Sequence, residues 1–209
     1  MDTRIAVIYY SSTGNVHKLA EAIAEGAREP GAEVRLRRVA ELAPEEAVQQ
    51  NPAWARHRDE TRDTVSEASL EDLRWADGYA FGTPTRFGNP AAQLKQYIDT
   101  AGGLWFEGAL ADKAVTSFTS ALYPDGGLES TILALNNVFY HWGCVLVPPG
   151  YTDPSIGEAG GNPYGAAFPS GAGRPTEAVL AAARHQGRRL AIFTAALKGA
   201  HVPGMAAAA

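Results

Sequence analysis

The stretch "RIAVIYYSSTGNVHKLAEAIAEGA" (residues 4–27) passes from a strand-like run through a polar turn into a helix-like repeat. Residues 4–10 are rich in β-branched and aromatic side chains, which is typical of a strand covered on both faces. From Val16 onward, apolar residues recur at helical spacing as far as Ala27. Between the two runs, residues 11–15 are two serines, a threonine, a glycine and an asparagine. Strand, polar turn and helix in this order are the unit of an α/β fold.

The same alternation continues along the chain. Strand-like runs follow at residues 31–39, 77–85, 113–122 and 144–148, with helix-like stretches at 128–142 and 176–198. The run at 31–39 alternates apolar and charged residues, as an outer strand would. Five strands separated by helices predict an α/β fold with a doubly wound, five-stranded parallel sheet and helices on both faces. Right-handed crossovers then place the carboxyl ends of the strands at one edge, where ligands bind.

Two segments are additional to the five strands and their connecting helices, and a third segment forms the C-terminal tail. Residues 41–74 are charged and poorly periodic, so we expect a solvated insertion with one short helix near 69–75. Residues 148–175 are almost half Gly and Pro, which argues against a helix, and the loop is too long to be idle. We expect this loop to form a cofactor wall or a subunit contact. We interpret residues 1–209 as a single domain whose tail, residues 199–209, is frayed.

Composition and charge exclude several classes of protein. The net charge of −5 disfavours nucleic-acid binding, which needs clustered Lys and Arg. Cys144, the single cysteine, excludes an internal disulfide and a cysteine-based metal cluster, and its apolar surroundings predict an inert thiol. No metal site is expected. The chain shows neither a signal-peptide pattern nor an apolar run near the ~20 residues of a membrane span, so we expect a cytoplasmic protein without a membrane partner.

The turn at residues 11–15 predicts a phosphate site. A helix N-terminus presents unpaired N–H groups and a partial positive charge, and the hydroxyls add hydrogen-bond donors. The glycine-lysine pattern of ATP-binding loops and the G-x-G-x-x-G of dinucleotide-binding turns are both absent. A hydroxyl-rich turn suits a compact phosphate monoester such as that of FMN. The alternative is an ordinary helix cap.

A second polar turn follows the third predicted strand, in "FGTPTRFGN" (residues 81–89). Pro84 and Gly88 are expected to make the backbone irregular, so that its amides point outward and meet the pyrimidine edge of a flavin. Phe87 and Trp105 offer flat apolar faces for a ring system, and the sequence places Trp105 in a glycine-flanked loop.

Four motifs together resemble the WrbA-type NAD(P)H:quinone oxidoreductases, relatives of flavodoxin that bind FMN. They are "YYSSTGNVHKLAEAIAEGA" (9–27), "FGTPTRFGN" (81–89), "DTAGGLW" (99–105) and "GNPYGA" (161–166). The resemblance covers essentially the whole chain. It implies a flavodoxin-like fold, one FMN per subunit, and a homotetramer whose active sites lie at subunit contacts. It also implies two-electron reduction of a quinone by NADH or NADPH, with ping-pong hydride transfer through flavin N5.

The resemblance assigns residues by matching motif. Those implied for the FMN phosphate are Ser11, Thr13, Gly14, Asn15 and Val16. Those implied for the isoalloxazine are Pro84, Thr85, Arg86, Phe87, Gly88 and Asn89. The loop after the fourth strand would contribute backbone contacts from Ser120, Ala121 and Leu122. Trp105 and His141 would be the catalytic wall, and His141 would also contact the cofactor.

Some roles stay open within this assignment. Arg86 would stabilise a reduced, anionic flavin or only brace its loop, and His141 would donate to the quinone oxygen or only cap its helix. The loop at residues 120–127 departs from the family pattern, Trp142 stands where many relatives have a second histidine, and Thr13 stands where a tyrosine is common.

Two other functions compete with the enzyme. A one-electron carrier of flavodoxin type would share the fold, although such carriers are usually shorter and more acidic. A non-enzymatic interaction protein would keep the fold without the cofactor. The sequence specifies neither the quinone, nor NADH against NADPH, nor dimer against tetramer.

Overall fold

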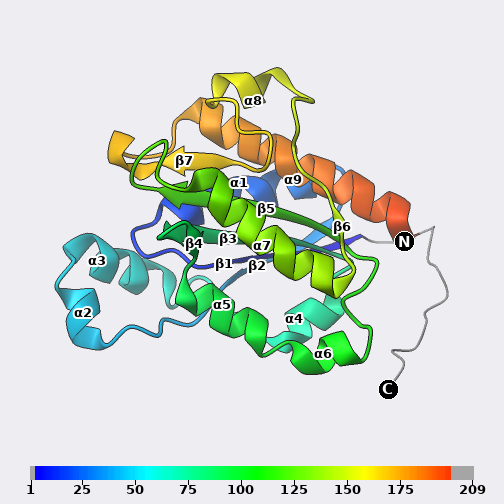
Figure 1. The fold of residues 1–209 in the computed structure, drawn as a ribbon, viewed down its shortest axis with the longest axis horizontal. Helices are drawn as coiled ribbons and strands as arrows, with labels where there is room; N and C mark the ends of the chain where they lie inside the picture. The colour runs from blue at the N-terminus through cyan, green and yellow to red at the C-terminus, as the bar shows by residue number, and fades with distance from the viewer. Residues whose placement is uncertain (1–2, 199–209) are drawn as a thin grey trace.

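The centre of the molecule is a parallel sheet with strand order β2-β1-β3-β5-β6 (Figure 1). The computed structural model describes residues 3–198. The five strands are β1 (Arg4–Tyr9), β2 (Glu33–Arg38), β3 (Gly78–Arg86), β5 (Ala114–Ala121) and β6 (Val145–Leu146). They match the five predicted runs, and β2 lies at the sheet edge as its alternating pattern predicts. The doubly wound α/β fold is thus confirmed.

Two short strands extend this sheet to seven, two more than the sequence predicts. β4 (Asn89–Pro90) pairs antiparallel with the end of β3, and β7 (Ala167–Pro169) pairs parallel with the end of β5. Because β6 pairs with the start of β5, two separate segments pair with the same edge of β5. The Gly/Pro-rich loop connects them. It contains the short helix α8 (Pro154–Glu158) and continues after β7 into the turn η1 (Ser170–Ala172). The expectation that this loop holds no helix was wrong, because α8 forms about one and a half turns. The helix begins with Pro154 at its first position and is capped by the Asp153 side chain.

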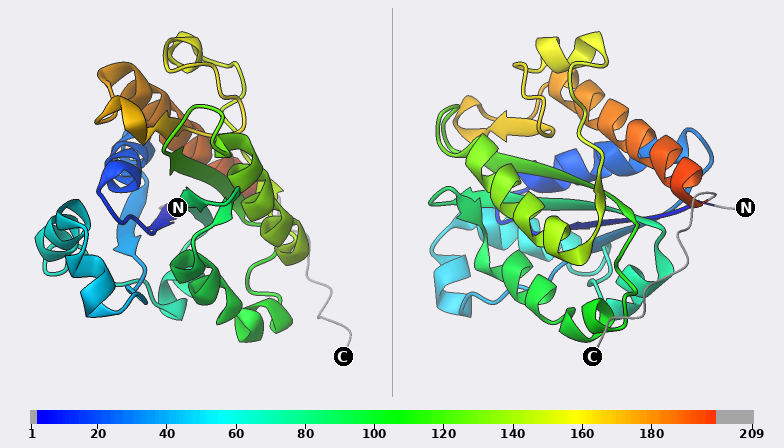
Figure 2. Two further views of the ribbon diagram at one scale, coloured as in Figure 1. Left: turned by 60° about the vertical axis from the view of Figure 1, so that its left-hand side comes forward. Right: turned by 45° about the vertical axis from the view of Figure 1, so that its right-hand side comes forward.

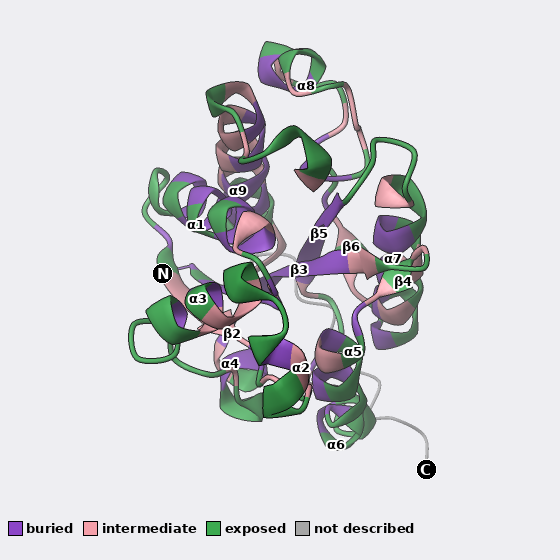
Figure 3. Cartoon of the chain, turned by 90° about the vertical axis from the view of Figure 1, so that its left-hand side faces the viewer, coloured by how far each residue is buried: buried purple, intermediate pink, exposed green. Residues whose placement is uncertain are grey.

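Helices cover both faces of the sheet, as Figure 2 shows from two sides. On β1, Ile5 and Val7 point into one apolar cluster and Ala6 and Ile8 into the other, because strand side chains alternate. The first cluster is closed by α1 (Asn15–Arg28) and α9 (Glu177–Lys198). The second is closed by α4 (Leu70–Trp75), α5 (Ala92–Asp99), α6 (Gly102–Phe106) and α7 (Leu128–Trp142). The sheet is accordingly buried along β3 and β5 and only half-buried along β2 (Figure 3).

Helices α1 and α9 cross at two glycines. A Cβ on Gly26 would lie 1.9 Å from the carbonyl oxygen of Arg184, and one on Gly187 would lie 2.0 Å from that of Ile23. Only glycine permits backbones to approach this closely. This contact sets the position of α1, and therefore of the turn before it.

The insertion at residues 41–74 is more ordered than expected. The short helix predicted near 69–75 is present as α4, but α2 (Glu45–Gln49) and α3 (Pro52–Thr61) precede it. Glu41 fastens the insertion to the body of the protein, since its carboxylate accepts hydrogen bonds from Tyr10, Trp54 and Gln93. Most of the segment is exposed, as expected of a solvated connection. The expectation of one short helix was wrong, because the half-buried Glu41 holds two further, weakly periodic helices in place.

Two expectations remain, one about the C-terminal tail and one about membrane-spanning helices. The predicted frayed tail lies outside the described residues. No helix in the described part of the chain is both long enough and apolar enough to span a membrane.

Candidate functional site

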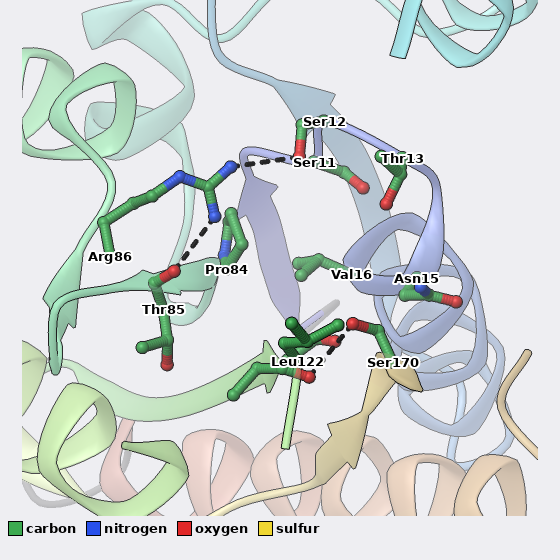
Figure 4. Close-up of a pocket in the computed structure, with 12 residues that line it drawn as sticks. Ser11, Ser12, Thr13, Asn15, Val16, Pro84, Thr85, Arg86, Leu122 and Ser170 are labelled. Atoms are coloured by element: carbon green, nitrogen blue, oxygen red, sulfur yellow. Dashed lines mark hydrogen bonds between the residues drawn. The ribbon is translucent and has the colours of Figure 1, made fainter. Parts of the chain in front are cut away.

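A cavity of about 170 Å³ opens at the carboxyl edge of the sheet, between the ends of β1, β3 and β5 (Figure 4). Its walls are Ser11, Ser12, Thr13, Asn15, Val16, Pro84, Thr85, Arg86, Ser120, Ala121, Leu122 and Ser170. Three strand ends and the η1 turn thus meet around one polar space, as the topology predicts for a parallel sheet.

One wall of the cavity is the start of α1. Ser11 Oγ accepts a hydrogen bond from the Gly14 amide at 3.1 Å, which closes the turn, and Gly14 has a φ of 96° that favours glycine. Within the described residues no side chain caps the first turn of α1. Its amides and its partial positive charge therefore face the cavity, with Thr13 and Asn15 beside them (Figure 4). The ordinary side-chain cap, which was the alternative for these residues, is therefore not formed.

Arg86 closes the cavity from the side of β3. Its guanidinium donates to Ser12 Oγ at 3.1 Å and to the Thr85 carbonyl at 2.9 Å, so it bridges two loops across the opening (Figure 4). Among the described residues Arg86 has no carboxylate partner. It is therefore a cation available to an anionic ligand in the cavity.

The wall formed by β5 is held by hydroxyl groups that bond to the backbone. Ser120 Oγ donates to the carbonyl of Phe168 at 2.8 Å, and Ser170 Oγ donates to the carbonyl of Ala121 at 3.0 Å. These bonds tie the end of the Gly/Pro-rich loop to β5. The loop thus forms a wall of the cavity, one of the two roles that its length suggested.

Two buried groups stand behind the turn. The Tyr9 hydroxyl lies 2.5 Å from His17 Nδ1, and His17 Nε2 lies 3.2 Å from Glu21. Burial lowers the pKa of His17 below its ordinary value, although Glu21 opposes this effect. His17 therefore supports the turn chiefly as a hydrogen-bonding ring rather than as a permanent charge.

The turn after β3 differs from its prediction. Thr85 and Arg86 pair with Pro90 and Asn89 in a short antiparallel ladder, so their backbone is not irregular and its amides do not all point outward. The ladder turns at Phe87 and Gly88, with φ of 53° and 76°, as a two-residue hairpin of the primed type requires. Phe87 is fully exposed there, so the strained turn holds an aromatic ring away from the core.

Trp105 and His141 lie at the other end of the molecule. Trp105 is part of α6 rather than a loop, and its Nε1 donates to the His141 carbonyl at 2.9 Å. Helix α7 starts beside Thr85, and its 15 residues span about 20 Å before reaching His141. Within one chain the predicted catalytic pair therefore does not reach the cavity.

Most of the residues predicted for the cofactor are brought together. Ten of them line the cavity. Gly14 shapes the turn without lining the cavity, while Phe87, Gly88 and Asn89 form the hairpin beside it. Ser12 and Ser170 line it but were not predicted, although Ser12 stood within the hydroxyl run. No local signal marks Ser170, which arrives through the return of the long loop.

The remaining candidate groups have structural roles. Burial raises the pKa of the Cys144 thiol to about 12, which agrees with an inert side chain. Trp142 is buried against Phe81 and Phe139. In residues 3–198 there is no cluster of side chains suited to a metal ion.

Comparisons with known proteins agree with this architecture. The family model described as NADPH-dependent FMN reductase matches residues 3–155. An NAD(P)H dehydrogenase (quinone) of Deinococcus radiodurans is 44% identical, over 94% of this chain and 98% of its own. One of Geobacter sulfurreducens is 43% identical, over 93% and 99%. The structure of a flavodoxin, WrbA-like protein from Agrobacterium tumefaciens matches with a TM-score of 0.68 at 25% identity, over 93% of this chain and 99% of that one. The predicted resemblance to the WrbA type and the flavodoxin-like fold are confirmed.

Proposed function

This chain belongs to the NADPH-dependent FMN reductase family, and from that premise we propose that it is an FMN-dependent NAD(P)H:quinone oxidoreductase. Relatives that are 40 to 44% identical over nearly their whole length carry the name NAD(P)H dehydrogenase (quinone). The single observation that carries the proposal is the uncapped start of α1 inside a hydroxyl-lined cavity at the carboxyl edge of the sheet.

The cavity fits the ribityl phosphate of FMN by its chemistry. A phosphate monoester needs several N–H and O–H donors close together, and the first turn of α1 supplies them together with Ser11 and Thr13. Arg86 adds one positive charge from the opposite wall. Ser120 and Ser170 are held by the backbone and present polar edges to the sugar chain.

The flavin ring would lie at the mouth of this cavity, near the hairpin. Phe87, Leu122 and Tyr123 are exposed apolar side chains on the two loops that border it. Such side chains exclude water from a planar ligand and from a partner stacked on it. When bound, FMN supplies the hydride chemistry that links NAD(P)H to a quinone. The chain itself contributes binding, orientation and the cation of Arg86.

Trp105 and His141 take part in this proposal through a neighbouring subunit. Three large aromatic side chains are exposed on these two helices: Trp105 and Phe106 on α6, and Tyr140 on α7. In a homotetramer this face would meet the hairpin of another copy, so that Trp105 borders its quinone and His141 donates to a quinone oxygen.

The test is steady-state oxidation of NADH and NADPH by FMN-loaded protein with benzoquinone as acceptor. We expect quinone-dependent turnover that exceeds the rate of free FMN at the same concentration. Parallel lines in double-reciprocal plots would support ping-pong transfer. Reductive titration should proceed in a single two-electron step, whereas a carrier would accumulate a one-electron form. Protein that takes up no FMN, or that turns over no faster than free FMN, would overturn the proposal.

A further inference from the structure

A second cavity, of about 570 Å³, adjoins the phosphate turn on the side of α3. It shares Thr13 and Asn15 with the first cavity, so the two are neighbours along the same edge of the sheet. The segment after β7 also joins them, because Ser170 lines the first cavity and Arg174 lines the second. A long ligand can therefore occupy both.

Cations dominate the wall of this second cavity. Lys18, Arg56 and Arg174 line it from three separate segments, whereas Glu60 is the one carboxylate among its lining residues. Lys18 pairs with Glu21 at 2.7 Å. The side chains of Arg56 and Arg174 are exposed and form no ion pair or hydrogen bond with any residue between 3 and 198. Three cations that converge on one cavity, two of them without a carboxylate partner, favour the binding of an anion there.

His57 adds a hydrogen-bonding group to this wall. Its side chain lines the second cavity and is only 8% exposed. Its ring lies against the His17 ring in a tilted arrangement, with 5.2 Å between the ring centroids. Neither of its ring nitrogens has a hydrogen-bond partner in the described part of the chain. They are not among the fully buried unpaired atoms of residues 3–198, so they are open to solvent or to a ligand. Burial lowers its pKa to about 4, so at neutral pH it can still donate one N–H without carrying charge.

We propose that the second cavity binds the 2′-phosphate and adenosine half of NADPH, so that this chain uses NADPH in preference to NADH. The inference rests on the proposed function, because it needs the nicotinamide to stack at the mouth of the first cavity. From there the dinucleotide would pass Thr13 and Asn15, which line both cavities, and enter the second cavity. A phosphomonoester matches two arginine forks and the His57 ring, and the 2′-phosphate is the group that distinguishes NADPH from NADH.

The kinetic test compares the two dinucleotides in the double variant Arg56→Ala/Arg174→Ala. Both side chains are exposed, so the variant should fold. We expect kcat/KM for NADPH to fall about 30-fold, mostly through KM, because a charge-assisted contact is lost at each arginine. The value for NADH should stay within twofold. The matched control is Arg28→Ala, an exposed arginine at the far end of α1, which should change neither value.

A binding test does not depend on turnover. Calorimetry on the FMN-loaded protein should show that adenosine 2′,5′-bisphosphate binds at least about 10-fold more tightly than adenosine 5′-monophosphate, and that the double variant abolishes the difference. The affinity of the variant for FMN should be unchanged.

Each other outcome overturns the inference. Equal losses with NADPH and NADH would mean that the arginines bind a group common to both. A lower affinity for FMN with an unchanged dinucleotide ratio would mean that they serve the flavin phosphate. Equal binding of the two nucleotides would refute the 2′-phosphate site without contradicting quinone reduction by NADH. Absence of turnover with both dinucleotides in the unmodified protein would instead refute the proposed function.

Discussion

Charged side chains near the carboxyl end of the sheet differ from those elsewhere in whether they have an ion-pair partner. At the amino end, Arg74 pairs with Glu107. Between the two ends, Asp72 on α4 accepts hydrogen bonds from Arg35 and Arg37 of β2. At the carboxyl end, Arg56, Arg86 and Arg174 stand around two cavities without a carboxylate partner among the described residues. Paired charges hold elements together, whereas several unpaired cations that converge on cavities favour the binding of an anion. An unpaired arginine alone does not indicate such a site, since the exposed Arg28 is also unpaired among the described residues.

The largest effect should come from replacing Gly14 by valine. A β-branched residue does not tolerate a φ of 96°, so the backbone would change and the amides of the turn would be displaced. We expect the affinity for FMN to fall at least about 100-fold, from the loss of two or more charge-assisted hydrogen bonds. Fluorescence titration with FMN measures it.

Gly31 provides the matched control for that variant. Its φ of 93° imposes a similar backbone strain, but nothing lies within 4 Å of its hypothetical Cβ, and it follows the distant end of α1. Gly31→Val should lower the melting temperature without changing the affinity for FMN. If both variants lost FMN equally, the turn would have no special role.

The next effect concerns stability at the paired charges between α4 and β2. Asp72 is 3% exposed and receives hydrogen bonds from Ser69 as well as from the two arginines. Asp72→Asn should lower the free energy of unfolding by about 2 kcal/mol, because it leaves Arg35 and Arg37 facing a neutral group. Urea denaturation measures the change. The exposed pair of Lys95 and Asp99 is the control, since Asp99→Asn should cost far less. A loss of FMN affinity in Asp72→Asn would contradict the distinction between paired charges and the unpaired cations around the cavities.

Trp105→Ala tests whether the amino end of one subunit serves the cavity of another. The affinity for FMN should stay unchanged, since Trp105 lies outside the cavity of its own chain, while quinone turnover falls about 10-fold through the loss of an aromatic contact. Phe193→Ala, which removes an exposed aromatic side chain on α9 at the other face of the sheet, is the control. Mixed oligomers of Trp105→Ala and Gly14→Val subunits should recover part of the activity. A fully active variant, or a protein that sediments as a monomer, would contradict this arrangement.

The smallest effect is a pH dependence at the carboxyl end. Burial lowers the pKa of His57 to about 4, whereas the unfolded chain has the ordinary value near 6.5. Between these values the unfolded state binds more protons, so stability falls as the pH decreases from about 6.5 to about 4. His57→Gln should reduce the loss of stability between pH 7 and pH 5 by about 1 kcal/mol. The exposed His141→Gln is the control, and an equal change in both variants would refute the assignment.

Sequence patterns predicted some elements of this fold and missed others. The strands and long helices were predictable because their periodicity is local, and the turn at residues 11–15 because strand, hydroxyls and helix follow each other directly. The helices of the insertion were missed because α3 is weakly amphipathic and is held by the Glu41 anchor rather than by its own pattern. The hairpin at Phe87 was missed because a positive φ at phenylalanine follows from pairing with β4.

By itself the sequence determined the alternation of strands and helices and the polar turn at residues 11–15, since both are visible in the local pattern of side chains. Only the tertiary structure decided that Ser170 joins the cavity, that Trp105 and His141 leave it, and that Arg56, His57 and Arg174 surround a second one. Those placements arise from segments more than 30 residues apart in the sequence, brought together by Glu41, by the return of the chain to β5 and by the glycine contact of α1 with α9. No local pattern encodes such distances, because burial against the whole sheet sets them.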